Sequence, residues 1–458
     1  MSNVSKVKTI DIFCLSQNSY EKDKNLSDKQ ISFLTNAGFS ASAGELLPLA
    51  NDEGQFEAFA FGLGKQENRP ALLSSILAAK LNSLKIKNTQ FQLKGGIENS
   101  KMAALGFLLG SYDFDKYKNQ SSSVLLKPSK QVDINEVKRL SEAAFIARDF
   151  INTAPNDLGP NGFEKEIISF ANKRKMKINT IVGDDLLKEN FPMVHAVGRA
   201  SEQAPRLIDM VWGNEEHAKI TLVGKGVTFD SGGLDIKHAA GMLIMKKDMG
   251  GAANVLGLAH AIIDAKLKIR LRVILPVVEN SISGNSFRPG DVLKSRAGIN
   301  VEIGNTDAEG RLILADALAL ADEEKPEMII DIATLTGAAR VALGTELVPL
   351  YCKDKNLAEM LYEAGENWDD PLWPMPLYQP YDRLLSSKIA DVNHITQGGY
   401  AGSITAALFL QRFIKNTKSW VHLDIYGWSV EARAGRTHGG TDQAIRAVYQ
   451  VLKDKYGS

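Results

Sequence analysis

The chain alternates between two hydrophobic patterns. Short runs of apolar and β-branched residues, typical of strands, are separated by longer segments whose apolar residues recur at helical spacing. The predicted strands are 8–15, 56–64, 122–127, 206–212, 219–226, 271–279 and 327–334, and the predicted helices are 71–84, 101–110, 133–153, 250–266 and 311–324. After residue 160 the strands are continuously apolar, which favours a largely parallel sheet covered by helices on both faces.

The segment 133–153 divides the chain. Asp133 stands where a helix cap is expected, and the breaker-rich stretch APNDLGPNG follows the helix. The 458 residues are about three times a common domain size of roughly 150. We therefore expect an α/β fold with a small N-terminal α/β domain (1–132), a connecting helix and linker (133–160), and a larger α/β domain (161–458) built on a central mixed, largely parallel sheet.

Charge and composition exclude several classes of protein. Lys and Arg number 54, as do Asp and Glu, so no overall charge favours binding to nucleic acid or to an anionic membrane. No run approaches the ~20 apolar residues of a membrane span, and no apolar segment follows the first lysines, so we expect a cytoplasmic protein with no membrane partner. Cys14 and Cys352 are too far apart in the sequence to suggest a disulfide framework or a thiolate zinc site.

A glycine-rich segment, 222–251, has no nucleotide-binding pattern. Gly226 follows Lys225 where a phosphate loop has Ser or Thr, and Phe229 occupies the last glycine position of a dinucleotide-binding loop. Neither G-x-S-x-G nor H-E-x-x-H occurs, which argues against a serine hydrolase and a histidine zinc site.

What remains is a set of four acidic residues on successive strand-end loops: Asp230, Asp248, Asp307 and Glu309. In an extended segment residues two apart face the same side, so we expect Asp307 and Glu309 to point into one cavity. Four carboxylates in one cleft need neutralising cations, and two divalent metals supply four positive charges and an activated water. Each acid alone is more often a surface or capping residue, so the prediction rests on their joint placement.

Four motifs carry a resemblance to a known family. GKGVTFDSGG, KKDMGGAA, NTDAEGRL and DIATLTGA make the chain similar, over about residues 140–450, to the leucine aminopeptidase (cytosol aminopeptidase) family of two-metal exopeptidases. The octapeptide NTDAEGRL is the signature of that family. The resemblance makes 161–458 the catalytic metallopeptidase domain, and it implies peptide substrates, removal of a mainly apolar N-terminal residue such as leucine, and a homohexamer.

The resemblance also implies a set of metal ligands, which are Lys225, Asp230, Asp248, Asp307 and Glu309. Asp230 and Glu309 would bridge two divalent ions, zinc or manganese, with magnesium or cobalt open. Lys225 would bind as a neutral amine, so its pKa would lie far below the ordinary ~10.4. The glycines beside Lys225 would leave room for the metal centre.

Two further cations and a pocket complete the implied site. Lys237 would donate to the scissile carbonyl and its oxyanion, and Arg311 would hold a bicarbonate that acts as the base. Met245, Thr334 and Gly337 would line the pocket for the first side chain. Tyr426 stands where many members have alanine, and a larger residue there narrows or repolarises the pocket.

This prediction has three alternatives. The same centre serves equally for an enzyme restricted to particular dipeptides. Some bacterial members of the family add a DNA-binding role, which the neutral net charge does not support. An inactive scaffold conflicts with the presence of all five ligand positions and both catalytic cations.

Overall fold

The structure is a computed structural model that describes residues 7–17, 20–86, 88–118 and 124–457. The chain forms two compact units. The smaller comprises residues 1–145 and 430–438, and the larger comprises residues 146–429 and 439–458. The domain boundaries expected at 132 and 160 stay a prediction. Residues 122 and 123 of the predicted strand 122–127 lie outside the described residues.

The smaller unit is built on a five-stranded sheet in the order β2-β3-β1-β4-β5. Its strands are β1 (Lys8–Ser16), β2 (Leu46–Ala50), β3 (Phe56–Gly64), β4 (Thr89–Gly95) and β5 (Leu125–Leu126), and its helices are α1 (Asp28–Asn36), α2 (Ser74–Ser83) and α3 (Ser100–Gly110). Short 3-10 helices, η1 (Tyr20–Lys22) and η2 (Gln66–Asn68), lie in its loops. β2 is antiparallel to β3, and the other pairs are parallel. The predicted strands 8–15 and 56–64 and helices 71–84 and 101–110 are confirmed.

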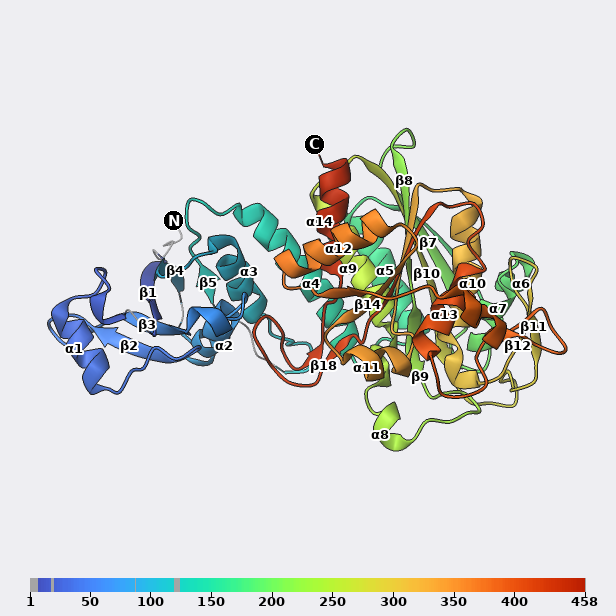
Figure 1. The fold of residues 1–458 in the computed structure, drawn as a ribbon, viewed down its shortest axis with the longest axis horizontal. Helices are drawn as coiled ribbons and strands as arrows, with labels where there is room; N and C mark the ends of the chain where they lie inside the picture. The colour runs from blue at the N-terminus through green and yellow to red at the C-terminus, as the bar shows by residue number, and fades with distance from the viewer. Residues whose placement is uncertain (1–6, 18–19, 87, 119–123, 458) are drawn as a thin grey trace, which may run out of the picture. The chain divides into compact units, whose positions relative to one another are not determined.

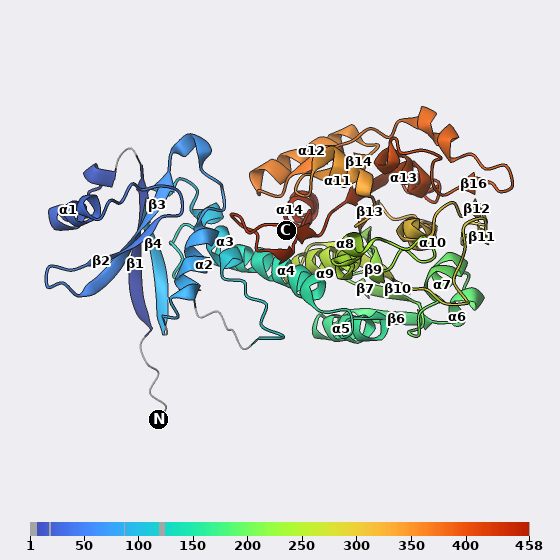
Figure 2. The ribbon, with the colours of Figure 1, turned by 90° about the horizontal axis from the view of Figure 1, so that it is seen from below.

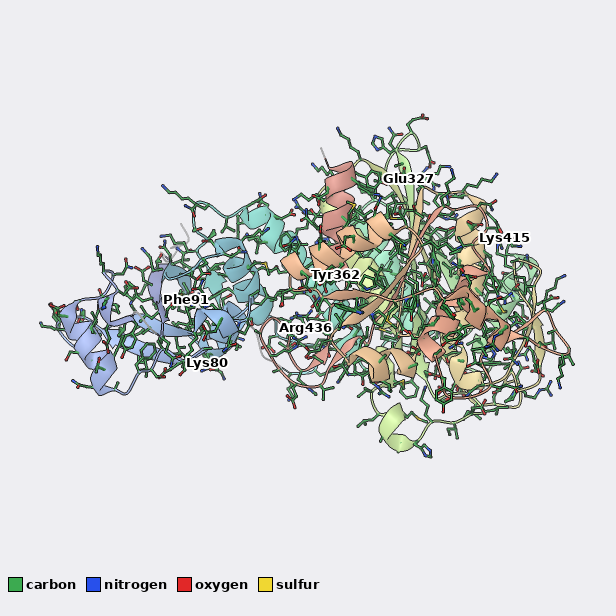
Figure 3. All side chains as sticks on the ribbon, viewed as in Figure 1. Lys80, Phe91, Glu327, Tyr362, Lys415 and Arg436 are labelled. Carbon is green, nitrogen blue, oxygen red and sulfur yellow. The ribbon has the colours of Figure 1, made fainter. Side chains whose placement is uncertain are left out.

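The sheet of the smaller unit buries both of its faces. Successive strand residues face opposite sides, so Ile12 of β1 packs in one cluster with Leu77 of α2, and Leu15 packs in another with Leu34 of α1. Phe91 of β4, labelled in Figure 3, belongs to the cluster under α2 and α3. The alternating apolar pattern of β1 therefore reflects two cores, one on each face.

The larger unit is built on a nine-stranded mixed sheet in the order β15-β14-β17-β13-β8-β10-β7-β6, with β9 paired to β10. Its strands are β6 (Lys177–Val182), β7 (Arg206–Trp212), β8 (Ala218–Gly224), β9 (Gly226–Asp230), β10 (Ile269–Asn280), β13 (Met328–Ala333), β14 (Val348–Cys352), β15 (Leu372–Pro374) and β17 (Ser419–Asp424). The central strands β17, β13, β8 and β10 are parallel, whereas β14, β7 and β6 add antiparallel pairs. The predicted mixed, largely parallel sheet is confirmed.

Helices cover both faces of this sheet (Figure 1). α9 packs on β8 and β13 from one face, and α10 and α7 pack on β8 and β10 from the other. α5 lies beside the edge strand β6 (Figure 2). Helix α4 (Ile134–Asn152) begins in the smaller unit and ends in the larger one. The other helices of the larger unit are α5 (Pro160–Lys173), α6 (Asp185–Lys188), α7 (Pro192–Gly198), α8 (Ala239–Met242), α9 (Gly250–Asp264), α10 (Gly310–Glu323), α11 (Gly337–Leu343), α12 (Lys355–Asn367), α13 (Gly402–Gln411) and α14 (Ile445–Tyr456).

Smaller elements complete the larger unit. They are β11 (Val292–Lys294), β12 (Asn300–Glu302), β16 (Val392–Asn393), β18 (Trp428–Ser429), β19 (Gly439–Gly440) and the 3-10 helices η3 (Met245–Met249), η4 (Thr306–Ala308) and η5 (Gln379–Leu385). Among the residues described, no helix is both long and apolar enough to span a bilayer.

Two local predictions are also confirmed. Asp133 caps α4, because its Oδ1 accepts hydrogen bonds from the backbone N–H groups of Asn135 and Glu136 at 3.0 and 3.2 Å. Cys14 and Cys352 are free thiols.

The parallel strands bring several loops to one edge of the larger sheet. β8, β9 and β13 all run in the direction of β10, so the loops that follow Gly224, Asp230 and Ala333 leave at the same edge. Ligands bind at the carboxyl edge in sheets of this kind. Asp230 ends β9 and Asp248 lies in the segment after it, whereas Asp307 and Glu309 follow β12 of a separate three-stranded sheet, so the expectation of four successive strand-end loops was wrong for these two residues.

Candidate metal centre

Lys225 lies in the break between β8 and β9 and is buried. The glycines on either side of it do not make room for the metal centre, so this expectation was wrong. A Cβ at Gly224 would lie 2.6 Å from the Ala252 backbone, and one at Gly226 would lie 2.6 Å from the carbonyl oxygen of Pro276. These glycines let α9 and β10 approach. The glycine that accommodates the lysine is Gly310, where a Cβ would lie 2.4 Å from Lys225 Cε.

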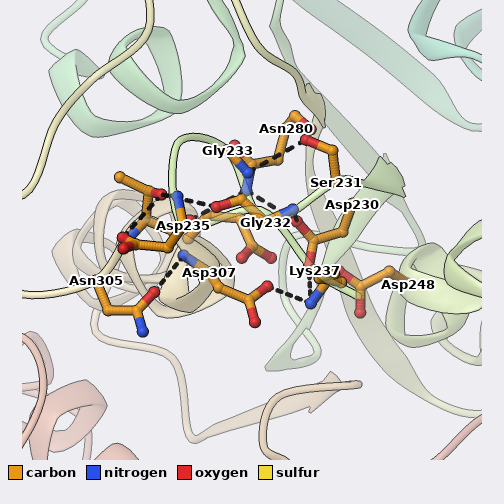
Figure 4. Close-up of polar contacts among 12 residues, drawn as sticks. Asp230, Ser231, Gly232, Gly233, Asp235, Lys237, Asp248, Asn280, Asn305 and Asp307 are labelled. Carbon is orange, nitrogen blue, oxygen red and sulfur yellow. Dashed lines mark hydrogen bonds and ion pairs between the residues drawn. The ribbon is translucent and has the colours of Figure 1, made fainter. Parts of the chain in front are cut away.

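Asp230 ends β9, and its carboxylate is held by two donors (Figure 4). Its Oδ1 accepts hydrogen bonds from the Gly232 N–H at 2.9 Å and from Asn280 Nδ2 at 2.8 Å. Asn280 also donates to the carbonyl oxygen of Thr306 at 3.1 Å, so it ties Asp230 to the segment that carries Asp307. Asn280 was not predicted as a site residue from the sequence. The feature that could have identified it is its position as a polar residue at the end of an apolar strand.

The segment that carries Asp307 and Glu309 is not extended, so that expectation was wrong. Thr306–Ala308 form the 3-10 helix η4, and Glu309 has helical angles (φ −67°, ψ −33°). Asn305 forms the turn by accepting the Asp307 N–H at 2.7 Å. Asp235 accepts the Thr306 N–H at 2.7 Å, which fixes the turn against the loop after β9.

The acidic side chains nevertheless converge as expected. Asp230, Asp307 and Glu309 each place a carboxylate oxygen within 4.8 Å of the others. The Lys237 ammonium lies 2.7 Å from Asp230 Oδ2 and also pairs with Asp307 (Figure 4). One carboxylate cluster is therefore formed by the end of β9 and the start of α10.

Lys225 links this cluster to Asp248, which lies in η3. Its ammonium is 2.8 Å from Asp248 Oδ2 and 3.0 Å from Glu309 Oε1, and it donates to the carbonyl oxygen of Thr334 at 2.8 Å. Asp248 Oδ2 and Glu309 Oε1 are buried, and these are the two carboxylate oxygens that pair with the Lys225 ammonium. All five predicted ligand side chains thus meet in one site, and all of them except Asp307 are buried.

The charges of the cluster are unbalanced. Burial, followed by the charges of Glu309 and Asp248, raises the pKa of Asp230 well above its usual range. Burial also raises the pKa of Glu309, although Lys225 opposes it. For Asp248 burial acts in the same direction, but Lys225 and Lys247 outweigh it and hold the pKa below its ordinary value. Four carboxylates face two lysines, which leaves two negative charges that bound cations would neutralise.

Lys225 by itself does not have the low pKa expected for a metal ligand. Burial lowers the pKa of its ammonium, but the charges of Asp248 and Glu309 outweigh burial and raise the pKa above its ordinary value. The carboxylates therefore keep the lysine protonated. Only cations that neutralise these carboxylates would release the amine as a ligand.

Arg311 is the second residue of α10 and is buried. Its Nη1 donates to the carbonyl oxygen of His394 at 2.7 Å, whereas its Nε has no hydrogen-bond partner. Burial lowers the pKa of Arg311 to about 10, so it remains a cation at neutral pH.

His394 clamps the loop that leads into η4, and nothing in the sequence singled it out. Its Nδ1 accepts the Gly304 N–H at 3.2 Å, and its Nε2 donates to the carbonyl oxygen of Asn305 at 2.9 Å. Burial, together with the nearby Arg311, lowers the pKa of His394 to about 3. The neutral ring therefore acts as a fixed donor and acceptor.

Two of the predicted pocket residues begin short helices, and the third contacts a predicted ligand. Met245 begins η3, Gly337 begins α11, and the Thr334 hydroxyl donates to Asp248 Oδ1 at 2.9 Å. Tyr426 follows β17, and its ring centroid lies 4.5 Å from the Lys247 ammonium. Lys247 was not selected from the sequence, because a lysine at a loop position is most often solvated.

The fold and the site define a metal-dependent hydrolase with a buried carboxylate and lysine centre at the strand ends of an α/β sheet. The sequence model described as "Cytosol aminopeptidase family, catalytic domain" matches residues 145–449. The chain therefore belongs to the cytosol aminopeptidase family, as the resemblance implied, and is a metalloaminopeptidase. Enzymes of this family use two divalent metal ions.

Known relatives agree over nearly the whole chain. A probable cytosol aminopeptidase of Ehrlichia ruminantium (strain Welgevonden) is 37% identical over 446 residues, which span 92% of this chain and 89% of that one. The crystal structure of the cytosol aminopeptidase of Coxiella burnetii has a TM-score of 0.91 at 40% identity and covers 98% of both chains. The bottromycin maturation enzyme BotP, in complex with Mn, has a TM-score of 0.88 at 30% identity, covering 98% of this chain and 99% of that one.

Proposed function

We propose that this chain removes the N-terminal residue of peptides at a two-metal centre held by Lys225, Asp230, Asp248, Asp307 and Glu309. The observation that supports this ligand set is the convergence of the Asp230, Asp307 and Glu309 carboxylates within 4.8 Å, with Asp248 joined to Glu309 through the Lys225 ammonium. Bound there, two divalent ions such as zinc or manganese supply an activated water and an anchor for the free α-amine of the substrate. This anchor explains selectivity for an N-terminus.

Lys237 polarises the scissile carbonyl group in this proposal. Its ammonium pairs with Asp230 and Asp307, which are both proposed ligands, so coordination of these carboxylates frees the lysine to turn toward substrate. There it donates to the carbonyl oxygen and to the oxyanion that develops on it. A donor of this kind contributes about 3 kcal/mol to the stability of a transition state.

Arg311 holds a bicarbonate ion in this proposal. The buried Nε without a partner leaves donor capacity on a planar fork that suits a planar anion. The N-terminal end of α10 also favours negative charge at this place. A bicarbonate held by Arg311 would supply an oxygen that can act as the general base for the water.

The resemblance also supports a homohexamer and a cytoplasmic location, which we include in the proposal, and it implies an apolar first residue such as leucine. Met245, Thr334 and Gly337 would contact the first side chain. Which side chain this pocket prefers is a separate question, because Tyr426 and Lys247 bring a ring and a charge to it.

The proposal is tested with leucyl p-nitroanilide and its N-acetylated form. We expect cleavage of the free-amine substrate alone, loss of activity with a chelator, and recovery with added manganese or zinc. Equal rates on the free and blocked substrates would rule out an exopeptidase.

A further inference from the structure

Beside the carboxylate cluster lies a buried cation without an acidic partner. Lys247 is 5% exposed, and its ammonium contacts the face of the Tyr426 ring at 4.5 Å from the centroid. No residue in the described part of the chain gives this ammonium a hydrogen bond or an ion pair. Burying a charge without an opposite charge is costly, so the position calls for an explanation.

Asp248 and Asp424 are the acidic residues whose charges act on Lys247, but both form their hydrogen bonds with other residues. Asp248 accepts a hydrogen bond from Thr334 at 2.9 Å and pairs with Lys225 at 2.8 Å. Asp424 accepts two backbone N–H groups of the turn after β13, at 2.9 and 3.1 Å. Lys247 therefore makes no direct contact with a carboxylate in the described part of the chain, although its charge acts on Asp248.

A second cation lies at the same ring. The Arg340 guanidinium of α11 is 5.7 Å from the centroid of Tyr426. It is exposed, and within the described residues it makes no hydrogen bond or ion pair. A Cβ placed on Gly337 would lie 4.0 Å from Arg340 Nη2, so this cation borders one of the predicted pocket residues.

Lys247 lies in the same 3-10 helix as Met245, next to Asp248, which is bonded to Thr334. Gly427, the residue after Tyr426, packs on Thr334, because a Cβ there would lie 3.2 Å from Thr334 Cγ2. The ring and the two cations at it are therefore connected, directly or through one neighbour, to the three residues expected to line the pocket for the first side chain.

We propose that Lys247 and Arg340, arranged about Tyr426, make this enzyme select peptides whose first residue is acidic, in place of the apolar preference that the resemblance implies. This inference rests on the aminopeptidase activity proposed above. A glutamate or aspartate side chain would give Lys247 the charge-assisted partner that it lacks. A leucine side chain would leave that charge buried and unpaired.

The test compares kcat/KM for glutamyl, leucyl and lysyl p-nitroanilides in the metal-loaded enzyme and in Lys247→Met. We expect the wild type to prefer the glutamyl substrate over the other two. In Lys247→Met the ratio of glutamyl to leucyl kcat/KM should fall about 10- to 100-fold, the size of a lost charge-assisted bond. The matched control is Lys246→Met, because the Lys246 ammonium donates instead to the carbonyl oxygen of Asn152 at 2.7 Å. That control should keep the wild-type ratio.

The outcomes separate this inference from the proposed function. Cleavage of leucyl anilide with no glutamyl preference, or an unchanged ratio in a folded and metal-loaded Lys247→Met, would overturn the inference and leave the aminopeptidase standing. A preference for dipeptides over anilides that disappears in Lys247→Met would assign the lysine to a C-terminal carboxylate and also overturn it. Failure to cleave any free-amine substrate would overturn both.

Discussion

The larger unit contains two groups of charged side chains. One has equal numbers of positive and negative charges, and the other has an excess of negative charge. In the first, which we call the arginine network, Arg148 and Arg446 face Asp370 and Asp442, all at most 1% exposed. Asp442 binds both arginines, and Asp370 accepts the backbone N–H groups that begin α14. In the second, the metal centre, four carboxylates face two lysines.

The difference distinguishes charges that hold the fold from charges that await a ligand. Two positive and two negative side chains satisfy one another in the arginine network, so nothing further is needed there. The metal centre keeps an excess of negative charge, because its four carboxylates share two lysines. Such an imbalance persists in a fold where a bound group corrects it.

The largest effect is expected from Glu309→Gln. This change removes one of the central carboxylates, so turnover should fall below detection and the metal content should fall below two ions per chain. The chelator-treated variant should unfold at no lower urea concentration than the wild type, because burial already disfavours the charged form of Glu309. Activity or metal content equal to that of the wild type would remove Glu309 from the site.

Asp442→Asn should lower the stability of the fold without changing metal binding. It leaves two buried arginines without their shared carboxylate, so the free energy of unfolding should fall by about 3–5 kcal/mol. Urea titration of the metal-loaded protein measures this loss, and the metal content of the folded fraction should not change. A loss below about 1 kcal/mol would show that the arginine network does not hold the fold together.

Lys237→Met separates catalysis from metal binding. The variant should retain both metals and lose about 100- to 1000-fold in kcat, because the donor to the oxyanion is gone. Metal analysis and steady-state kinetics on the same preparation provide the comparison. A fall of less than tenfold would leave the lysine without a catalytic role.

The smallest effect concerns acid stability. His394 has a folded pKa of about 3, below the ~6.5 of an unfolded chain, so the unfolded state takes up a proton that the folded state refuses. Stability is therefore complete above about pH 6.5 and is lost as the pH falls toward 3. Between pH 7.5 and 5.5 the wild type should lose about 1.4 kcal/mol more than His394→Gln in urea titrations. Equal losses in the two proteins would contradict the low pKa.

Most elements could be predicted from the sequence, because hydrophobic spacing decides them. α10 shows helical spacing and β10 a continuous apolar run, and both were found within two residues of their ends. The metal ligands could be identified because they lie in short motifs, each attached to a strand end or a helix start.

Other parts of the site depend on contacts between distant segments. Asp235 and Asn280 fix the 3-10 turn at Thr306. These contacts join segments that are far apart in the chain, so the residues around Thr306 do not predict them. The role of Gly224 and Gly226 depends on the packing of α9 and β10.

The metal content of the purified chain, measured together with turnover, decides whether the carboxylate cluster is the catalytic centre. Chelated protein is titrated with manganese or zinc, and bound ions and leucyl or glutamyl anilide hydrolysis are measured in each sample. We expect two ions per chain at saturation and activity that rises from zero as they bind. Full activity in chelated protein, or saturation below one ion per chain, would contradict the two-metal site.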